Sequence, residues 1–181
     1  MIDYKLMNDS IIYYEKKEYQ RIETPWLVTA AVDNITKPVD AVPFIVEAKK
    51  KNLIASGEQG FLYLYLKGYL PKTKLQTVTP CFRNDVFDFT HTKYFMKNEL
   101  IQTDDTTICR LDEIVEDSLN FFQPFFKTKL DVLTTPQGYD IMCKEHEIGS
   151  YGIRECDFLK WIYGTACAEP RTSSLIELDN R

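Results

Sequence analysis

With 181 residues, 44% of them hydrophobic, the chain is long enough for one domain with a sizeable core and little else. Its apolar runs are too short to span a bilayer and its start lacks a signal-peptide pattern, so we expect a cytoplasmic protein without a membrane partner. A net charge of −5 argues against a general binder of DNA or RNA, although it leaves room for a local basic face. Five cysteines without CxxC spacing indicate reduced thiols and argue against a zinc site.

The first part of the chain is expected to contain a helix, a strand and a long connection. The helix is predicted over residues 9–21, where Asp9 or Ser10 can cap it. The strand is predicted over 21–32, with Pro25 at an edge or a bulge. Residues 33–50 contain two prolines and several polar residues, which favour a loop with a short strand at 44–48.

Ser56, Gly57, Glu58 and Gln59 stand just before an apolar segment, residues 61–70, that is predicted to be helical. In isolation this pattern favours a helix N-terminus, with serine as the cap and an acid in the first turn. A role in substrate binding is the alternative, and it depends on the other segments described below.

The rest of the chain has the pattern of a mixed α/β protein. Strands are predicted over 73–82 and 91–101, which are rich in threonine, valine, phenylalanine and tyrosine. A core helix is expected over 112–122 and ends before Pro124. Two short strands are predicted around the turn at 136–138, and a last helix begins near Ser173.

The two strands around residue 90 contain the side chains best suited to bind a nucleotide. Arg83 and Asp85 follow the first strand, and His91, Phe95 and Glu99 recur at a spacing of four. Phe95 and Glu99 therefore lie on one side of any strand that contains both. The arginine can fork onto a phosphate, the aromatic ring can offer its face to a base, and the histidine can reach a more distant phosphate.

Residues 79–102 resemble motif 2 of the class II aminoacyl-tRNA synthetases, which runs Arg-x-acid, a loop, then Arg/His-x-x-x-Phe-x-x-x-Glu. The short loop is similar to that of the aspartyl, asparaginyl and lysyl enzymes. Two positions depart from the family pattern: Thr90 replaces an arginine, and Tyr94 replaces a glutamate. One phosphate or tRNA contact would therefore be weaker or absent.

Other segments resemble the same family in the same order. The predicted helix and strand of residues 9–32 resemble motif 1, which forms the dimer. Ser56 and Glu58 resemble the Thr-x-Glu loop of seryl enzymes. Glu147 and Ser150 match the seryl Glu-Ile-Ser-Ser stretch, and the span to Arg154 fits the aspartyl Glu-x-Gly-Gly-Gly-Ser-x-Arg pattern. A salt-bridged strand end is the alternative for this stretch.

The last segment resembles motif 3 of the seryl enzymes, Asn-Gly-Ser/Thr-Ala-x-Ala-x-x-Arg-Thr. Gly164 and Arg171 occupy its glycine and arginine positions, and Tyr163 replaces the asparagine. An arginine at a helix start can point toward a terminal phosphate.

The resemblance implies an α/β fold of the α+β kind, an antiparallel sheet flanked by helices, formed by residues 1–181 as one catalytic domain without an anticodon-binding domain. It also implies a homodimer that uses ATP and Mg²⁺ to turn an amino acid into an acyl-adenylate. Arg83 and Asp85 would act at the ATP site with His91, Phe95, Glu147 and Arg171; Arg83 and Arg171 would be catalytic. Ser56, Glu58 and Gln59 would bind the amino acid, and Glu147 and Ser150 the metal.

Three functions remain open from the sequence. The chain could charge the acceptor end of a tRNA, pass its adenylate to a non-tRNA acceptor as a ligase, or serve as a non-catalytic paralogue with a binding or regulatory role. Thr90, Tyr94 and the acidic pI of about 5.1 favour the third, whereas Arg83, Phe95 and Arg171 argue against it. The absence of a second domain and the net charge of −5 predict no tight, sequence-specific binding of a whole tRNA.

Overall fold

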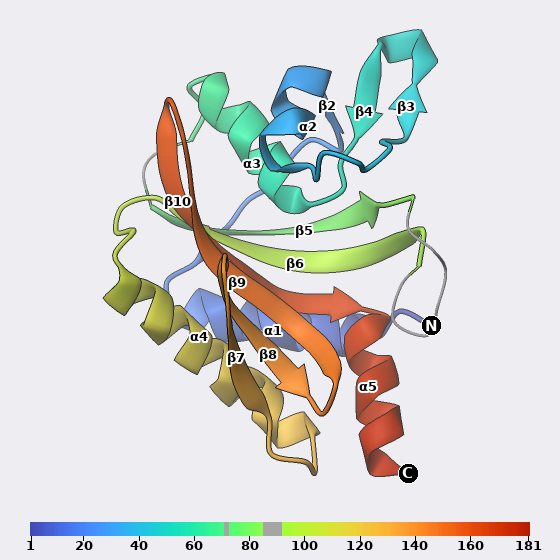
Figure 1. Ribbon diagram of the computed structural model, residues 1–181, viewed down its shortest axis with the longest axis vertical. Helices are drawn as coiled ribbons and strands as arrows, with labels where there is room; N and C mark the ends of the chain where they lie inside the picture. Colours follow the sequence, from blue (N-terminus) through green and yellow to red (C-terminus); the bar gives the residue numbers. More distant parts are fainter. Residues whose placement is uncertain (71–72, 85–91) are drawn as a thin grey trace.

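The computed structural model describes residues 1–70, 73–84 and 92–181, and a seven-stranded sheet forms its centre (Figure 1). The strand order is β1-β5-β6-β10-β9-β8-β7, and every neighbouring pair is antiparallel except β1 with β5. The strands are β1 Gln20–Arg21, β5 Lys74–Phe82, β6 Tyr94–Gln102, β7 Asp131–Thr135, β8 Gly138–Cys143, β9 His146–Cys156 and β10 Leu159–Glu169. The predicted antiparallel sheet flanked by helices is confirmed.

A second, three-stranded sheet has the order β2-β4-β3 and is also antiparallel. Its strands are β2 Leu27–Val28, β3 Ile45–Val46 and β4 Lys51–Leu53. The helices are α1 Tyr4–Lys16, α2 Ala30–Thr36, α3 Gly57–Leu66, α4 Ile108–Phe122 and α5 Arg171–Asn180, with 3₁₀ turns at Glu47–Lys49 and Gln123–Phe125. No helix in the described part of the chain is long and apolar enough to cross a membrane.

The large sheet has a hydrophobic core on each face. Helices α1, α4 and α5 cover one face, where Tyr14, Phe122 and Tyr151 are fully buried. Helices α2 and α3 and the small sheet cover the other, where Phe61, Leu62 and Trp161 pack together (Figure 1). Along a strand, successive side chains therefore enter different cores, and the second core shares its face with the candidate site.

The N-terminal third differs most from the sequence-based prediction. Helix α1 begins at Tyr4 instead of Asp9 because Asp3, not Asp9 or Ser10, caps it by accepting the backbone N–H groups of Lys5 and Leu6. Instead of one strand, the segment 21–32 contains the last residue of β1, the two-residue strand β2 and the start of helix α2. Thr29 caps α2 within a segment predicted as strand and loop, so local capping outweighed the predicted strand at 30–32.

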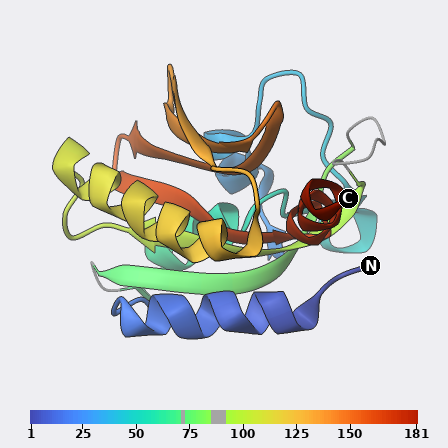
Figure 2. The same ribbon diagram turned by 90° about the horizontal axis from the view of Figure 1, so that it is seen from below.

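A buried carboxylate joins the two ends of the chain. Glu169 closes β10 and is fully buried. Its oxygens accept the backbone N–H of Asp3 at 2.9 Å, and the backbone N–H and hydroxyl of Ser173 at 3.0 and 2.7 Å. The starts of α1 and α5 thus meet at one anion, which the positive ends of both helix dipoles favour. Figure 2 shows α5 and the start of α1 at the same end of the molecule.

We expect replacement of Glu169 by alanine to lower the free energy of unfolding by about 2–4 kcal/mol, because three donors lose a buried acceptor. Urea denaturation followed by circular dichroism measures the change. The matched control is Glu177→Ala at an exposed position of α5, the helix that follows Glu169, which should change stability by less than about 0.5 kcal/mol. Equal stabilities of the two variants would contradict the structural role of Glu169.

Candidate nucleotide and substrate site

One cavity of about 470 Å³ lies on the face of the sheet that α3 and the small sheet cover. Its walls come from the end of β5, from β6, β9 and β10, from the starts of α3 and α5, and from the connection that follows α2. All eight described residues that the sequence places at the site line it: Ser56, Glu58, Gln59, Arg83, Phe95, Glu147, Ser150 and Arg171. Asp85 and His91 lie outside the described residues.

Two β-bulges turn side chains toward the cavity. In a regular strand, these side chains would point away from it. On β9, Glu147 pairs with Met142 and Gly149 with Ile141, so Ile148 is an extra residue. Glu147 and Ser150 are three apart, yet both line the cavity because the extra residue restores a common face. On β10, the shift between Thr165 and Cys167 has the same effect.

Arg83 and Phe95 form the part of the cavity predicted to hold the nucleotide. The Arg83 guanidinium lies over the Phe95 ring, 5.1 Å from its centre. Arg83 Nε also donates to the carbonyl of Ala55 at 3.1 Å, which fixes the arginine against the segment before α3. An arginine held in this way presents its remaining donors in a fixed fork, a geometry suited to phosphate.

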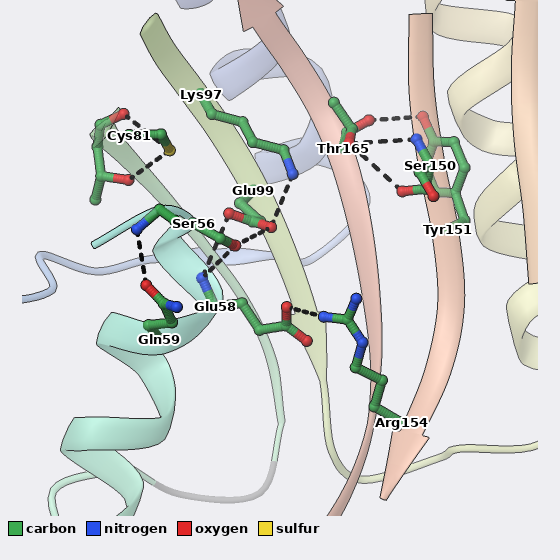
Figure 3. Close-up of polar contacts among 12 residues, drawn as sticks. Ser56, Glu58, Gln59, Cys81, Lys97, Glu99, Ser150, Tyr151, Arg154 and Thr165 are labelled. Atoms are coloured by element: carbon green, nitrogen blue, oxygen red, sulfur yellow. Dashed lines mark hydrogen bonds and ion pairs between the residues drawn. The ribbon is translucent and has the colours of Figure 1, made fainter. Parts of the chain in front are cut away.

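The start of α3 rests on a buried carboxylate from β6. Ser56 caps the helix by accepting the Glu58 N–H, which confirms that this stretch is a helix N-terminus. The same hydroxyl donates to Glu99 Oε1 at 2.7 Å, and Lys97 Nζ lies 2.8 Å from that oxygen (Figure 3). Burial alone would raise the pKa of Glu99, but Lys97 and the hydrogen bonds outweigh it, and the pKa is lowered.

Glu58 is buried and makes a second ion pair, with the partly exposed Arg154 of β9 (Figure 3). Its other oxygen accepts the indole N–H of Trp161 at 2.6 Å, and the Arg154 guanidinium stacks 4.1 Å from the centre of the Tyr163 ring. Burial raises the pKa of Glu58, although Arg154 opposes the shift. Because a carboxylate has about four acceptor positions, these two contacts leave Glu58 able to accept a further donor.

Gln59 is bound entirely to protein groups. Its amide oxygen accepts the Ala55 N–H at 2.8 Å, and its nitrogen donates to Asp33 at 2.7 Å. Asp33 in turn accepts a hydrogen bond from Asn52 at 2.9 Å, so the contact ties α3 to α2 and to the small sheet. The amino-acid-binding role predicted for Gln59 stays a prediction.

Arg171 and Glu147 form an ion pair of 2.7 Å at the other end of the cavity, where α5 begins. Ser150 stands on the same face as Glu147. A carboxylate and a hydroxyl are the hard oxygen donors that Mg²⁺ prefers, and Mg²⁺ in such sites takes most other ligands from phosphates and water. The two residues therefore fit the predicted metal role, although the described residues contain no group of three or more His, Cys, Asp or Glu arranged to hold a metal alone.

Sequence analysis did not assign Lys97, Arg154, Tyr163 or Thr165 to the site, yet all four line the cavity. Two of them lie next to residues that the sequence singled out, and alternation could have found the first. Lys97 lies midway between the predicted residues Phe95 and Glu99 on β6, and Tyr163 immediately precedes Gly164 of the motif on β10. The partner of Arg154 could not be found in this way, because 96 residues separate it from Glu58.

Replacement of Lys97 by methionine should lower the free energy of unfolding by about 3–5 kcal/mol at pH 7, since Glu99 would remain buried without its cation. The lowered pKa means that Glu99 stabilises the wild type above its unfolded pKa of about 4.3, and that this contribution is lost as the pH falls through the lower folded value. In the variant the folded pKa should lie above the unfolded one.

The stability difference between the wild type and the variant should therefore shrink from pH 7 to pH 3. Urea unfolding at several pH values measures it, with exposed Lys93→Met as the control. A difference that does not change with pH would show that Lys97 does not act through Glu99.

Comparisons with known proteins find similarity in structure and none in sequence families. No protein-family model matches the sequence, and no curated protein does. Among solved structures, pyrrolysyl-tRNA synthetase from Desulfitobacterium hafniense is similar, with a TM-score of 0.75 and 15% identity over 98% of this chain and 70% of that one.

Two serine-specific structures are also similar. Cytoplasmic serine-tRNA ligase from Naegleria fowleri, in complex with AMP, gives a TM-score of 0.74 with 19% identity, over 97% of this chain and 53% of that one. Seryl-tRNA synthetase from Pyrococcus horikoshii, complexed with ATP, gives 0.73 with 15% identity, over 96% and 49%. The chain thus spans about half to seven tenths of these proteins, and its fold is that of a class II aminoacyl-tRNA synthetase catalytic core.

Proposed function

We propose that this protein binds ATP and an amino acid in the cavity and joins them into an aminoacyl-adenylate. The observation that supports this most is the convergence of eight predicted site residues, from six separate elements or connections, on a single cavity. Two structurally similar synthetases, which contain AMP and ATP, favour a nucleotide as one ligand.

In the proposed reaction, a carboxylate oxygen of the amino acid attacks the α-phosphorus of ATP, the bond from that phosphorus to the bridging oxygen breaks, and pyrophosphate leaves. No proton has to move, so catalysis depends on position and charge neutralisation. Arg83 would hold the α-phosphate, with Asp85 beside it in the motif, and Phe95 would stack on adenine. Arg171, with His91, would meet the β- and γ-phosphates.

Glu58 and Ser56 would hold the amino acid. Glu58 keeps acceptor positions for an ammonium group beside its contacts with Arg154 and Trp161. Glu147 and Ser150 would hold Mg²⁺, which when bound would neutralise charge on the phosphates. The Arg171–Glu147 ion pair would keep the arginine near the same phosphates before ATP binds.

The acceptor of the aminoacyl group is a separate proposal. Transfer to a tRNA acceptor end is slightly favoured over transfer to a non-tRNA acceptor, on the frequency of that activity in the family. A homodimer through α1 and the segment after it likewise stays a prediction. The non-catalytic alternative is less favoured, because Arg83, Phe95 and Arg171 all face the one cavity.

Replacement of Arg83 by alanine should weaken ATP binding by about 1.5–3 kcal/mol, the usual contribution of a charge-assisted hydrogen bond. Isothermal titration calorimetry with ATP measures the loss. Lys93→Ala, which removes an exposed positive charge nearby, serves as the control for nonspecific attraction. Equal ATP affinity in the Arg83 variant and the wild type would remove Arg83 from the site.

ATP–pyrophosphate exchange, measured with each of the twenty amino acids, tests the reaction itself. We expect exchange with at least one of them in the presence of Mg²⁺, and a loss of at least about 100-fold in the Arg171→Ala variant, since that arginine would act on charge that moves in the transition state. ATP binding without exchange for any amino acid would favour the non-catalytic alternative.

A further inference from the structure

The end of the cavity next to the start of α3 is lined by side chains that are paired with each other. The Glu58–Arg154 ion pair runs from α3 to β9 across this end, with the Tyr163 ring beneath the guanidinium and the Trp161 indole N–H on the carboxylate. Figure 3 shows the pair lying between the helix and the strand. Tyr163 is buried, and its hydroxyl lies so close to Gly152 that a Cβ on that glycine would be 2.7 Å from it.

The ion pair at this end limits the size of a ligand side chain. A large ligand side chain could enter only by separating Glu58 from Arg154, which would leave a buried carboxylate without its cation, a strongly unfavourable change. The whole cavity is about 470 Å³, in the lower half of the range of roughly 300–1,000 Å³ usual for ligand sites, and it would have to hold a nucleotide as well.

The same end of the cavity is polar and its charges are balanced. Besides Glu58 and Arg154, its walls include Ser56, Lys97, Glu99 and Thr165. The two buried acids have one cation each, at Arg154 and Lys97. A charged ligand side chain would add a buried charge without a partner. A purely apolar one would cover hydroxyl and carboxylate groups without making hydrogen bonds to them.

We propose that the amino acid activated here has a small, uncharged, polar side chain, and that the Glu58–Arg154 ion pair excludes larger ones. This inference rests on the proposed function. It separates the site from that of an enzyme for a bulky substrate, whatever the overall similarity of fold, because size and polarity are set by these local contacts and not by the sheet.

The test compares kcat/KM for ATP–pyrophosphate exchange across a set of amino acids with the wild-type protein. Serine, threonine or asparagine should exceed leucine, phenylalanine, lysine and aspartate by at least about 100-fold. Alanine separates size from polarity, and should fall at least about tenfold below the best polar substrate, because buried polar groups would lose a partner.

A variant then tests the ion pair directly. Glu58→Gln combined with Arg154→Met removes both charges together and leaves neither buried alone, so the chain should still fold. The ratio of leucine to serine activity should rise at least about tenfold, whatever the loss in absolute rate. The control removes an exposed ion pair, Lys5→Met with Asp9→Asn, and should leave the ratio unchanged.

The outcomes distinguish the two proposals. Exchange that favours leucine, phenylalanine, lysine or aspartate in the wild type would overturn the inference and leave amino-acid activation standing, as would alanine equal to the best polar substrate. An unchanged leucine-to-serine ratio in a folded Glu58/Arg154 variant would overturn the role of the ion pair. No exchange with any amino acid would overturn the proposed function, and the inference with it.

Discussion

The buried carboxylate of Glu99 is the contact on which the site depends. It stands on a central strand of the sheet and receives the Ser56 hydroxyl, the Glu58 N–H and the Lys97 ammonium. It thereby takes one of the backbone donors that an α-helix leaves unsatisfied at its start, and fixes α3 on the sheet. Only glycine fits at position 57, since a Cβ there would lie 2.9 Å from Thr77 and 3.2 Å from Glu99. Glu58 can meet Arg154 only because the helix starts at this position.

The alternation of side chains along a strand explains how much of the site could be predicted from the sequence. Phe95 and Glu99 were correctly placed on one face from their spacing alone, and Ser56 was correctly identified as a helix cap, because both rules act within a few residues. Glu147 and Ser150 violate simple alternation, and only the resemblance linked them. The bulge that places them on one face depends on how β9 pairs with β8, and no local sequence pattern predicts that pairing.

The errors in the N-terminal third have the same origin. Residues 27–32 have the composition of a strand, but only Leu27 and Val28 pair with β4. The residues after them begin helix α2, because Thr29 can cap a helix. The position of α2 is then fixed by Asp33, which binds Asn52 and Gln59 from two other segments. Such a three-way contact between distant residues has no periodicity, so the sequence placed Asp33 in a loop and did not reveal its contacts with Asn52 and Gln59.

The free-energy cost of burying charged side chains helps to decide whether the residues around the cavity serve ligand binding or only the stability of the fold. A buried ion pair contributes little stability relative to well-packed apolar side chains of the same volume, and it is costly when one partner is lost. This chain nevertheless buries Glu58 and Glu99 against the same cavity, each with a cation, while apolar residues fill the two cores on either side of the sheet. A fold kept for stability alone gains little from that arrangement. Fixed charges beside a cavity, held by hydrogen bonds before any ligand arrives, are what the proposed binding of an ammonium group by Glu58 requires.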